Sequence, residues 1–234
     1  MKNVSIITVC YNSEADIEKT IKSVVPFVSD IVEYVVIDGG STDNTLHILN
    51  KYKNKISILV SEPDKGIYDA MNKGLKIANG KWCIFINCGD LLLHLPKVLF
   101  NQDNDKYAGV FGSVKVEEGI IIKPSFDWRL KIRNSLPHQG LFYNKSLIDV
   151  QFDTQLKIFS DYDFNFKMYK MGIDYLIVDD IIAFHSLIGI SNSQKAVKEL
   201  FFVINKNGGL LFVILSYIYF KFCGLSNRLK KWMK

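Results

Sequence analysis

Cysteine is scarce in this sequence, and no secretory leader is visible. The four cysteines, at positions 10, 83, 88 and 223, form no C-x-x-C pair and no metal-ligand spacing, which argues against a disulfide framework and against a zinc site. The first residues, "MKNVSIITVC", contain too short an apolar run for a signal peptide and no cleavage site. We therefore expect a protein of the cytoplasm with reduced thiols.

Two phosphate-binding signatures are also missing. The chain contains no G-x-x-x-x-G-K-[ST] loop, and "DGGSTD" at 38–43 does not fit G-x-G-x-x-G. These absences exclude a P-loop protein and a dinucleotide-binding protein of the usual kind.

Acidic residues are absent from the C-terminal end. The net charge of +5 equals the five basic residues from Lys221 onward, where no Asp or Glu occurs, so the first 220 residues are formally neutral. Because nucleic-acid binding requires a basic face on the folded domain, we expect no nucleic-acid partner.

The first ninety residues alternate between short apolar strands and helical patterns. Strands are expected at 4–9, 34–38, 56–61 and 82–87, with a helix after each of the first three. This alternation predicts an α/β fold with a mostly parallel sheet and helices on both faces. After Asp90 the pattern changes. An antiparallel pair is expected at 108–116 and 119–123, a strand in "PHQGLFY", and a helix at 160–171.

Polar side chains follow each of the four strands. Because the carboxyl ends of parallel strands share one edge, where ligands of α/β sheets bind, we expect a nucleotide there. Asp38 ends an apolar strand, which favours a ligand role, whereas Ser41, Thr42 and Asp43 are explained as helix caps and Ser13 with Asp16 as a capping box. The expected ligand-binding residues are Thr8, Tyr11, Asn12, Asp38, Glu62, Asp64, Lys65, Asn87, Gly89 and Asp90.

The C-terminal segment is the most apolar part of the chain. A helical pattern from Lys195 ends in "GGLLFVILSYIYF", and the uncharged run 207–220 has 14 residues, against about 20 for a spanning helix. An apolar stretch beside basic residues suits attachment to an anionic leaflet. The alternative is a helix that packs on the core.

Four segments together resemble family 2 glycosyltransferases, in particular bacterial enzymes of O-antigen, capsule, lipopolysaccharide and exopolysaccharide biosynthesis. They are "VSIITVCYNSEADIEKTIKSV", "VVIDGGSTDNT", "SEPDKGIYDAMNKGLKIANGKWCIFINCGD" and "SDYDF". The resemblance implies the GT-A (nucleotide-diphospho-sugar transferase) fold, with a smaller antiparallel acceptor-side part and a C-terminal apolar and basic helix. We divide the chain into a catalytic domain, 1–194, and a membrane-associating tail, 195–234. The domain comprises a nucleotide-binding half, 1–92, and an acceptor-side half, 93–194.

The resemblance also implies a nucleotide-diphosphate sugar donor, here a UDP-sugar. Thr8 and Tyr11 would line the base pocket, and Asp38 would bind the uracil or ribose side. Asp90 matches the last acid of the family's D-x-D segment and would hold Mn²⁺ or Mg²⁺, although Asn87, Cys88 and Gly89 stand where the other acid is expected. One carboxylate can suffice, because the diphosphate and water supply further oxygen ligands.

Five further residues receive expected roles. Asp161 matches the family's catalytic base, with Asp163 as the second candidate; without the resemblance, "SDYDF" is a helix cap at Ser160 followed by acids in the first turn. His185 is expected as a second metal ligand or diphosphate contact, or else as a packing histidine. His138 and Gln139 are expected to contact the acceptor, with packing as the alternative.

The predicted activity is inverting transfer of one sugar onto a lipid-diphosphate-linked saccharide, with a β-linkage, at the inner face of the cell membrane. One alternative is a sugar-nucleotide-binding module without activity, which donor hydrolysis would contradict. The other is a sugar nucleotidyltransferase, which would need glycine and arginine in the loop after the first strand. "TVCYNSEAD" contains neither.

Overall fold

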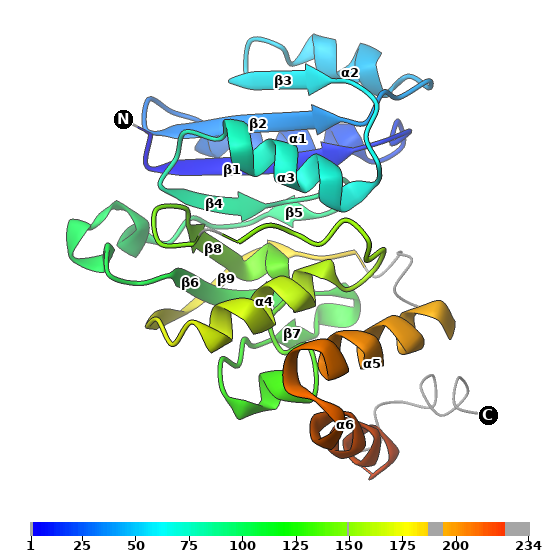
Figure 1. The fold of residues 1–234 in the computed structure, drawn as a ribbon. Coiled ribbons are helices and arrows are strands. Elements are labelled where there is room, and N and C mark those ends of the chain that lie inside the picture. The colour runs from blue at the N-terminus through cyan, green and yellow to red at the C-terminus, as the bar shows by residue number, and fades with distance from the viewer. Residues whose placement is uncertain (1, 149, 187–193, 223–234) are drawn as a thin grey trace.

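The computed structural model describes residues 2–148, 150–186 and 194–222, and shows one mixed sheet covered by helices (Figure 1). The predicted alternation of strands and helices over the first ninety residues is confirmed. The strands are β1 (Val4–Cys10), β2 (Val32–Asp38), β3 (Ile58–Ser61), β4 (Trp82–Phe85), β5 (Leu91–Leu92), β6 (Gly109–Lys115), β7 (Ile121–Ile122), β8 (Leu141–Asn144) and β9 (Tyr175–Phe184). The α-helices are α1 (Ile17–Val24), α2 (Thr45–Lys51), α3 (Ile67–Ile77), α4 (Ser160–Lys170), α5 (Gln194–Gly208) and α6 (Leu210–Phe222).

The strand order is β3-β2-β1-β4-β8-β6-β9-β5, with β7 paired to β6. The first four strands are parallel, whereas β8 runs antiparallel to both β4 and β6. The predicted antiparallel pair is present as β6 and β7. The sheet therefore joins a parallel half to a mixed half, as the GT-A expectation requires.

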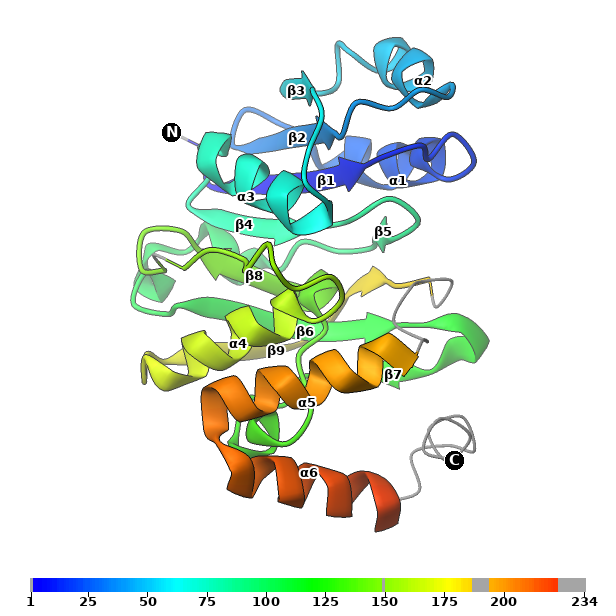
Figure 2. The same cartoon turned by 45° about the vertical axis from the view of Figure 1, so that its right-hand side comes forward.

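Each face of the sheet has its own hydrophobic core, because successive side chains of a strand point to opposite faces. On β1, Ile7 and Val9 pack in the core beneath α3, whereas Ile6 packs in the core beneath α1. Helices α3, α4 and α5 cover one face and α1 lies behind the sheet (Figures 1 and 2). Gly74 of α3 makes this packing possible, since a Cβ there would lie 2.6 Å from Cγ2 of Ile7.

Several local predictions were wrong. Neither Asp16 nor Phe159, the N-cap residues of α1 and α4, forms a side-chain cap, so the capping box is absent and Ser160 lies inside α4. The spacing of Ile67, Met71 and Leu75 predicts one buried face of α3. Met71 is buried and Leu75 packs against the core, but Ile67 is 46% exposed and its place is taken by Tyr68.

The C-terminal segment forms two helices instead of one. They are separated at Gly209, whose φ of +83° is the left-handed conformation that favours glycine. Helix α5 belongs to the folded core, with Val203 and Ile204 fully buried and Lys206 3.2 Å from Asp163 of α4. The division of the chain at residue 194 remains a prediction, although α5 packs with the residues before it. Helix α6 lies at the end of the molecule away from α2, with Ser216 and Phe220 buried (Figures 1 and 2).

Helix α6 has 13 residues, or about 20 Å at 1.5 Å per residue. Across residues 2–148, 150–186 and 194–222, no helix combines the length and apolarity needed to cross a bilayer. The basic residues predicted to contact a leaflet, Arg228 to Lys234, lie outside the described residues.

Candidate active site

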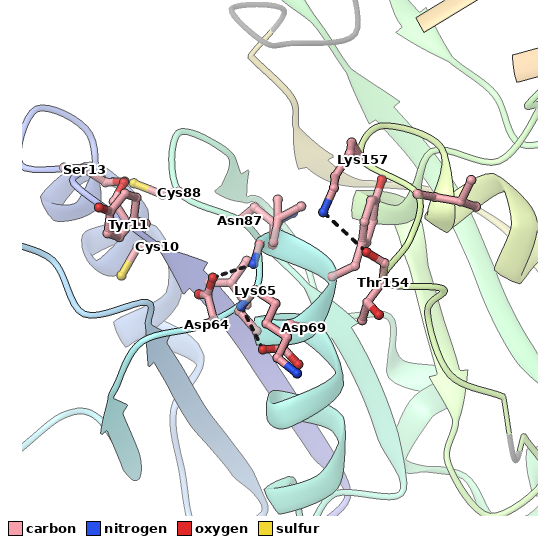
Figure 3. Close-up of a pocket in the computed structure, with 16 residues that line it drawn as sticks. Cys10, Tyr11, Ser13, Asp64, Lys65, Asp69, Asn87, Cys88, Thr154 and Lys157 are labelled. Carbon is pink, nitrogen blue, oxygen red and sulfur yellow. Dashed lines mark hydrogen bonds between the residues drawn. The ribbon is translucent and has the colours of Figure 1, made fainter. Parts of the chain in front are cut away.

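A cavity of about 480 Å³ lies at the carboxyl edge of β1 and β4. Figure 3 shows its three walls: Tyr11, Ser13 and Cys88 on one side, Thr154 and Lys157 on the other, and Asp64, Lys65 and Asp69 between them. The hydroxyl of Tyr68 donates to the Ile158 carbonyl at 2.6 Å and ties α3 to the segment before α4. The remaining lining residues are Val9, Cys10, Gly66, Ile67, Tyr68, Ala70, Asn87 and Leu156.

Tyr11 presents an aromatic face to this cavity. Its side chain is 58% exposed and lies close to Gly39, where an added Cβ would be 3.4 Å from the ring and 2.3 Å from Oδ2 of Asp64. The other oxygen of Asp64 accepts from the Gly66 N–H at 2.7 Å. An exposed ring beside an oriented carboxylate can stack a base and bind a ribose hydroxyl.

Three of the residues predicted to bind the nucleotide sugar lie near this edge of the sheet but do not line the cavity. Thr8 is buried between strands, donating to the Ile86 carbonyl at 2.7 Å and accepting from Tyr34 at 3.1 Å, and it does not line the cavity in this structure, so its contact with the base remains a prediction. Asn12, with φ 47°, accepts from the Thr42 N–H at 2.8 Å and joins two loops. Glu62 is exposed and paired with Lys73 at 2.9 Å.

Asp38 is completely buried, so it does not line the cavity in this structure. Its carboxylate accepts from the hydroxyl and N–H of Ser41, and from the Ser61 hydroxyl at 2.6 Å. These bonds hold the 39–45 loop against β3. Ser41 therefore donates hydrogen bonds to Asp38 and is not the helix cap that was predicted. Contact of Asp38 with the base or ribose remains a prediction.

Asp90 and His185 meet because β5 and β9 pair with Leu91 opposite Phe184. Nδ1 of His185 lies 2.7 Å from Oδ1 of Asp90, and Nε2 of Gln139 donates to Oδ2 at 3.0 Å. Burial lowers the pKa of His185, but the hydrogen bond and charge of Asp90 outweigh burial and the pKa is raised overall. Gln139, predicted to contact the acceptor, is 3% exposed and instead orients this pair.

The turn that carries Asp90 is held from α1. The Gly89 N–H donates to the Thr20 hydroxyl at 3.0 Å, and that hydroxyl donates to the Asp90 carbonyl at 2.9 Å. The backbone conformation of Gly89 is what requires glycine. Nothing lies within 4 Å of its Cβ position, and its φ of +94° is left-handed.

Asp161 lies at the start of α4 with 9% of its surface exposed. Its Oδ2 is 3.3 Å from Nδ1 of His138 and accepts from Asn134 at 3.4 Å. The other ring nitrogen of His138 is 3.2 Å from Nδ2 of Asn87, a lining residue of the cavity. Within the described residues, Oδ1 of Asp161 and Oδ1 of Asn87 are buried and lack hydrogen-bond partners.

Asp163 has a different environment. It is fully buried and pairs with Lys167 at 2.6 Å and Lys206 at 3.2 Å, and it accepts from Asn207 at 2.7 Å. Residues two apart on a helix point to different sides. Asp163 therefore does not share the surroundings of Asp161, and its contacts with Lys206 and Asn207 anchor α5. This geometry favours Asp161 over Asp163 as the base.

Two residues near the site were missed in the sequence. Lys157 lines the cavity, and Glu199 of α5 accepts the backbone N–H groups of Lys157, Ile158 and Phe159 at 2.7–3.1 Å. These contacts fix the segment that leads into Asp161. No sequence spacing indicates them, because the partners are about forty residues apart.

A reactive thiol is disfavoured at the site. Burial raises the pKa of Cys88 to about 11 and also raises that of Cys10 far above its ordinary value. Because the thiolate is the nucleophilic form of cysteine, neither residue is suited to covalent catalysis.

The site offers few protein ligands to a cation. Among the described residues, no three His, Cys, Asp or Glu side chains gather as a metal site. Asp90 and His185, which lie 2.7 Å apart, are the residues that would hold a divalent ion, if its other ligands came from a diphosphate and water. One carboxylate and one imidazole are too few ligands for Mn²⁺ or Mg²⁺ unless the diphosphate and water supply the rest.

A parallel half, a mixed second half and an aspartate after β4 are features of the GT-A fold. The family model described as "Glycosyl transferase family 2" matches residues 5–174. The chain therefore belongs to glycosyl transferase family 2 and is a glycosyltransferase, as predicted from the four motifs.

Two curated relatives are similar in sequence. A "PGL/p-HBAD biosynthesis glycosyltransferase" of Mycobacterium tuberculosis is 29% identical over 182 residues, covering 71% of this chain and 69% of the relative. The Escherichia coli "UDP-Glc:alpha-D-GlcNAc-diphosphoundecaprenol beta-1,3-glucosyltransferase WfaP" is 35% identical over 129 residues, or 54% of this chain and 51% of WfaP.

Solved structures agree on the fold. TarS of S. aureus superposes with a TM-score of 0.70 at 21% identity, covering 99% of this chain and 46% of TarS. A shorter form, TarS 1–349, was solved in complex with UDP-GlcNAc. The mannosyltransferase PcManGT of Pyrobaculum calidifontis, in complex with GDP-Man and Mn²⁺, gives a TM-score of 0.65 at 14% identity, covering 97% of this chain and 77% of PcManGT. The chain thus spans about half of TarS and of WfaP.

Proposed function

We propose that this protein transfers a sugar from a UDP-sugar to a lipid-diphosphate-linked saccharide, with inversion at the anomeric carbon. The observation that carries the proposal is Asp161, which is almost buried, keeps one oxygen without a partner, and is linked through His138 to the cavity residue Asn87. A base so placed serves an acceptor hydroxyl that approaches the donor.

The cavity is assigned to the donor nucleotide. Tyr11 would stack on the base and Asp64 would bind the ribose, because both line the cavity and lie beside Gly39. Lys65 and Lys157 line the cavity and supply positive charge for the diphosphate. The UDP-GlcNAc complex of TarS and the name of WfaP support a UDP-sugar.

The chemical step requires one proton transfer. The acceptor hydroxyl oxygen attacks the anomeric carbon, the bond from that carbon to the diphosphate oxygen breaks, and Oδ1 of Asp161 takes the hydroxyl proton. Attack from the side opposite the leaving group inverts the configuration. Asn134 and His138 hold Oδ2, and Oδ1, which has no partner among the described residues, would take the proton.

Asp90 and His185 would hold the divalent cation, with Gln139 orienting the carboxylate. Such an ion offsets the charge that develops on the leaving diphosphate. Thr20 and Gly89 keep Asp90 in place, and the two cavity lysines bind the phosphate oxygens that remain.

The acceptor proposal rests on the name of WfaP and on α6. Helix α6 has seven large apolar residues that are 40–77% exposed, a surface that a soluble helix normally covers. The helix is too short to span a bilayer, and five basic residues follow from Lys221. We assign this face to the surface of an anionic leaflet, where a lipid-linked acceptor is confined. The exposed residues are Leu210, Leu211, Ile214, Leu215, Tyr217, Ile218 and Phe222.

Asp161→Asn tests the catalytic assignment. With Mn²⁺, UDP-sugars and a synthetic lipid-diphosphate saccharide, we expect wild type to release UDP and lengthen the acceptor. The variant should lose at least 10²-fold in kcat, because general-base catalysis contributes 10²–10⁴-fold, while its Kd for UDP stays within twofold. Asp103→Asn, at an exposed carboxylate, is the matched control. Full turnover by Asp161→Asn would refute the base assignment.

The same assay separates the alternatives. Donor binding without product from any UDP- or GDP-sugar would favour a binding module. Pyrophosphate-dependent formation of UTP from a UDP-sugar would favour a nucleotidyltransferase.

The membrane assignment is tested by flotation with vesicles of anionic phosphatidylglycerol and neutral phosphatidylcholine. We expect wild type to float with the anionic vesicles, and Leu211→Glu with Ile214→Glu to remain in solution. Ile31→Glu is the control, because Ile31 is 44% exposed and directly precedes β2, in the parallel half of the sheet. If the α6 variant floats as well as wild type, α6 is not the attachment surface.

A further inference from the structure

We infer that His138 is a positioning residue for Asp161, and that it couples the base to the donor cavity through Asn87. This inference rests on the proposed function. The sequence suggested an acceptor contact for His138. In the structure the imidazole instead lies between two polar side chains from different halves of the chain.

The contacts of His138 fit one tautomer of the neutral ring. Nδ2 of Asn87 is a donor, so Nε2 of His138, 3.2 Å away, accepts. The proton of a neutral ring is then on Nδ1, which donates to Oδ2 of Asp161 at 3.3 Å. These two hydrogen bonds connect Asn87 through His138 to Asp161, and each of them has one donating and one accepting atom.

Two oxygens without a hydrogen-bond partner indicate where substrates would contact this hydrogen-bonded group. Oδ1 of Asn87 and Oδ1 of Asp161 are buried acceptors that the described residues leave without a partner. Buried polar atoms are normally hydrogen-bonded, so each oxygen is suited to a hydroxyl donor. Asn87 lines the cavity, and its oxygen suits a hydroxyl of the donor sugar. The oxygen of Asp161 suits the hydroxyl of the acceptor.

Position in the fold explains the coupling. His138 begins the short 3₁₀ turn His138–Gly140 that precedes β8, and β8 pairs with β4. Gly140 allows this turn to lie against β6, since a Cβ there would be 2.5 Å from the Gly112 carbonyl. The next residue, Gln139, bonds to Asp90 at 3.0 Å. Two adjacent side chains of one turn thus hold the base and the diphosphate end of the site.

Conservative variants distinguish this role from a structural one. In His138→Asn the side-chain amide can replace Nδ1–H and keep the bond to Asp161, whereas His138→Gln and His138→Ala do not keep a donor at that place. We expect a kcat loss of about 10-fold for the Asn variant and about 10²-fold for the Gln and Ala variants, because small misplacements of catalytic groups cost that much. The donor KM and the Kd for UDP should stay within about threefold. His47→Asn, at an exposed histidine of α2, is the control and should match wild type.

A double variant makes the test specific. If His138 acts through Asp161, then Asp161→Asn with His138→Ala should be no slower than Asp161→Asn alone, because residues that act as a unit are not additive. Additive losses, or equal losses for the Asn and Gln variants, would overturn the inference. If Asp161→Asn itself retains full activity, the proposed function fails instead, and the two failures remain distinct.

Discussion

Glu33 offers the sharpest test of how this sheet is held together away from the active site. It is 2% exposed, near the start of β2. Oε1 accepts from the Ser5 hydroxyl at 2.5 Å, the Asn79 N–H at 2.5 Å and the Gly80 N–H at 3.3 Å. Oε2 accepts from the side chain of Asn79 at 3.2 Å. The carboxylate thus joins β1, β2 and the turn before β4.

Glu33→Gln keeps the shape of the side chain and removes its charge. Hydrogen bonds to charged groups contribute about 1.5–3 kcal/mol, against about 1 kcal/mol for neutral ones. Weakening three bonds, and placing an NH₂ group against the donor of Asn79, should cost about 2 kcal/mol in the free energy of unfolding. Asp30→Asn, at an exposed carboxylate just before β2, is the control and should change stability by less than about 0.5 kcal/mol.

The pH dependence of this loss has a definite sign. Burial raises the pKa of Glu33, but the hydrogen bonds from Ser5, Asn79 and Gly80 outweigh burial and lower it below the ordinary value of 4.5. A depressed folded pKa stabilises the protein above the unfolded pKa, and this contribution is lost as the pH falls toward the folded pKa. The gap between wild type and Glu33→Gln should therefore be full at pH 7 and should shrink below about pH 4.5.

Urea denaturation followed by circular dichroism at several pH values between 7 and 3 measures this gap. Activity at pH 7 below the melting temperature should be unchanged, because Glu33 lies at the edge of the sheet opposite the cavity. A gap that stays constant down to pH 3, or a variant as stable as wild type at pH 7, would refute the reasoning.

Three further predictions concern the site. Tyr11→Ala should raise the Kd for UDP about tenfold, since stacking on an aromatic ring contributes about 1–3 kcal/mol; calorimetric titration measures this, and an unchanged Kd would place the base elsewhere. Gly39→Ala should weaken UDP binding at nearly constant stability, because the new Cβ displaces Asp64, 2.3 Å away; tight binding by this variant would contradict the role of Asp64. Glu199→Gln should lower kcat and thermal stability together, because three backbone N–H groups before α4 lose a charged acceptor; melting curves and initial rates test it, and unchanged values would show that α5 does not hold the segment.

Much of the parallel half was predictable, and the reason is local. Apolar runs bounded by polar corners specify strands, and strict alternation with helices specifies parallel pairing, so the edge that carries Tyr11, Asp64, Asn87 and Asp90 followed from the order of elements alone. Side-chain direction did not follow. Thr8 and Asp38 also lie near that edge, yet both are buried and bonded to neighbouring strands.

The acceptor side depended on contacts between distant segments. His185 lies beside Asp90 through the antiparallel pairing of β5 and β9, a contact across 95 residues. Glu199 reaches the start of α4 because α5 packs on the core, although its sequence resembled the beginning of a tail. Neither contact leaves a periodic signal in the sequence.

The sequence by itself determined the class of this protein. Four motifs in order, four strand ends with polar residues, and the acids of "SDYDF" were sufficient for a family 2 glycosyltransferase with Asp90 and Asp161 as the candidate metal ligand and base. Only the tertiary structure decided how these acids are held. The orientation of a buried carboxylate depends on which donors surround it, and here those donors, His138, Gln139 and His185, come from strands and turns that are adjacent only after folding.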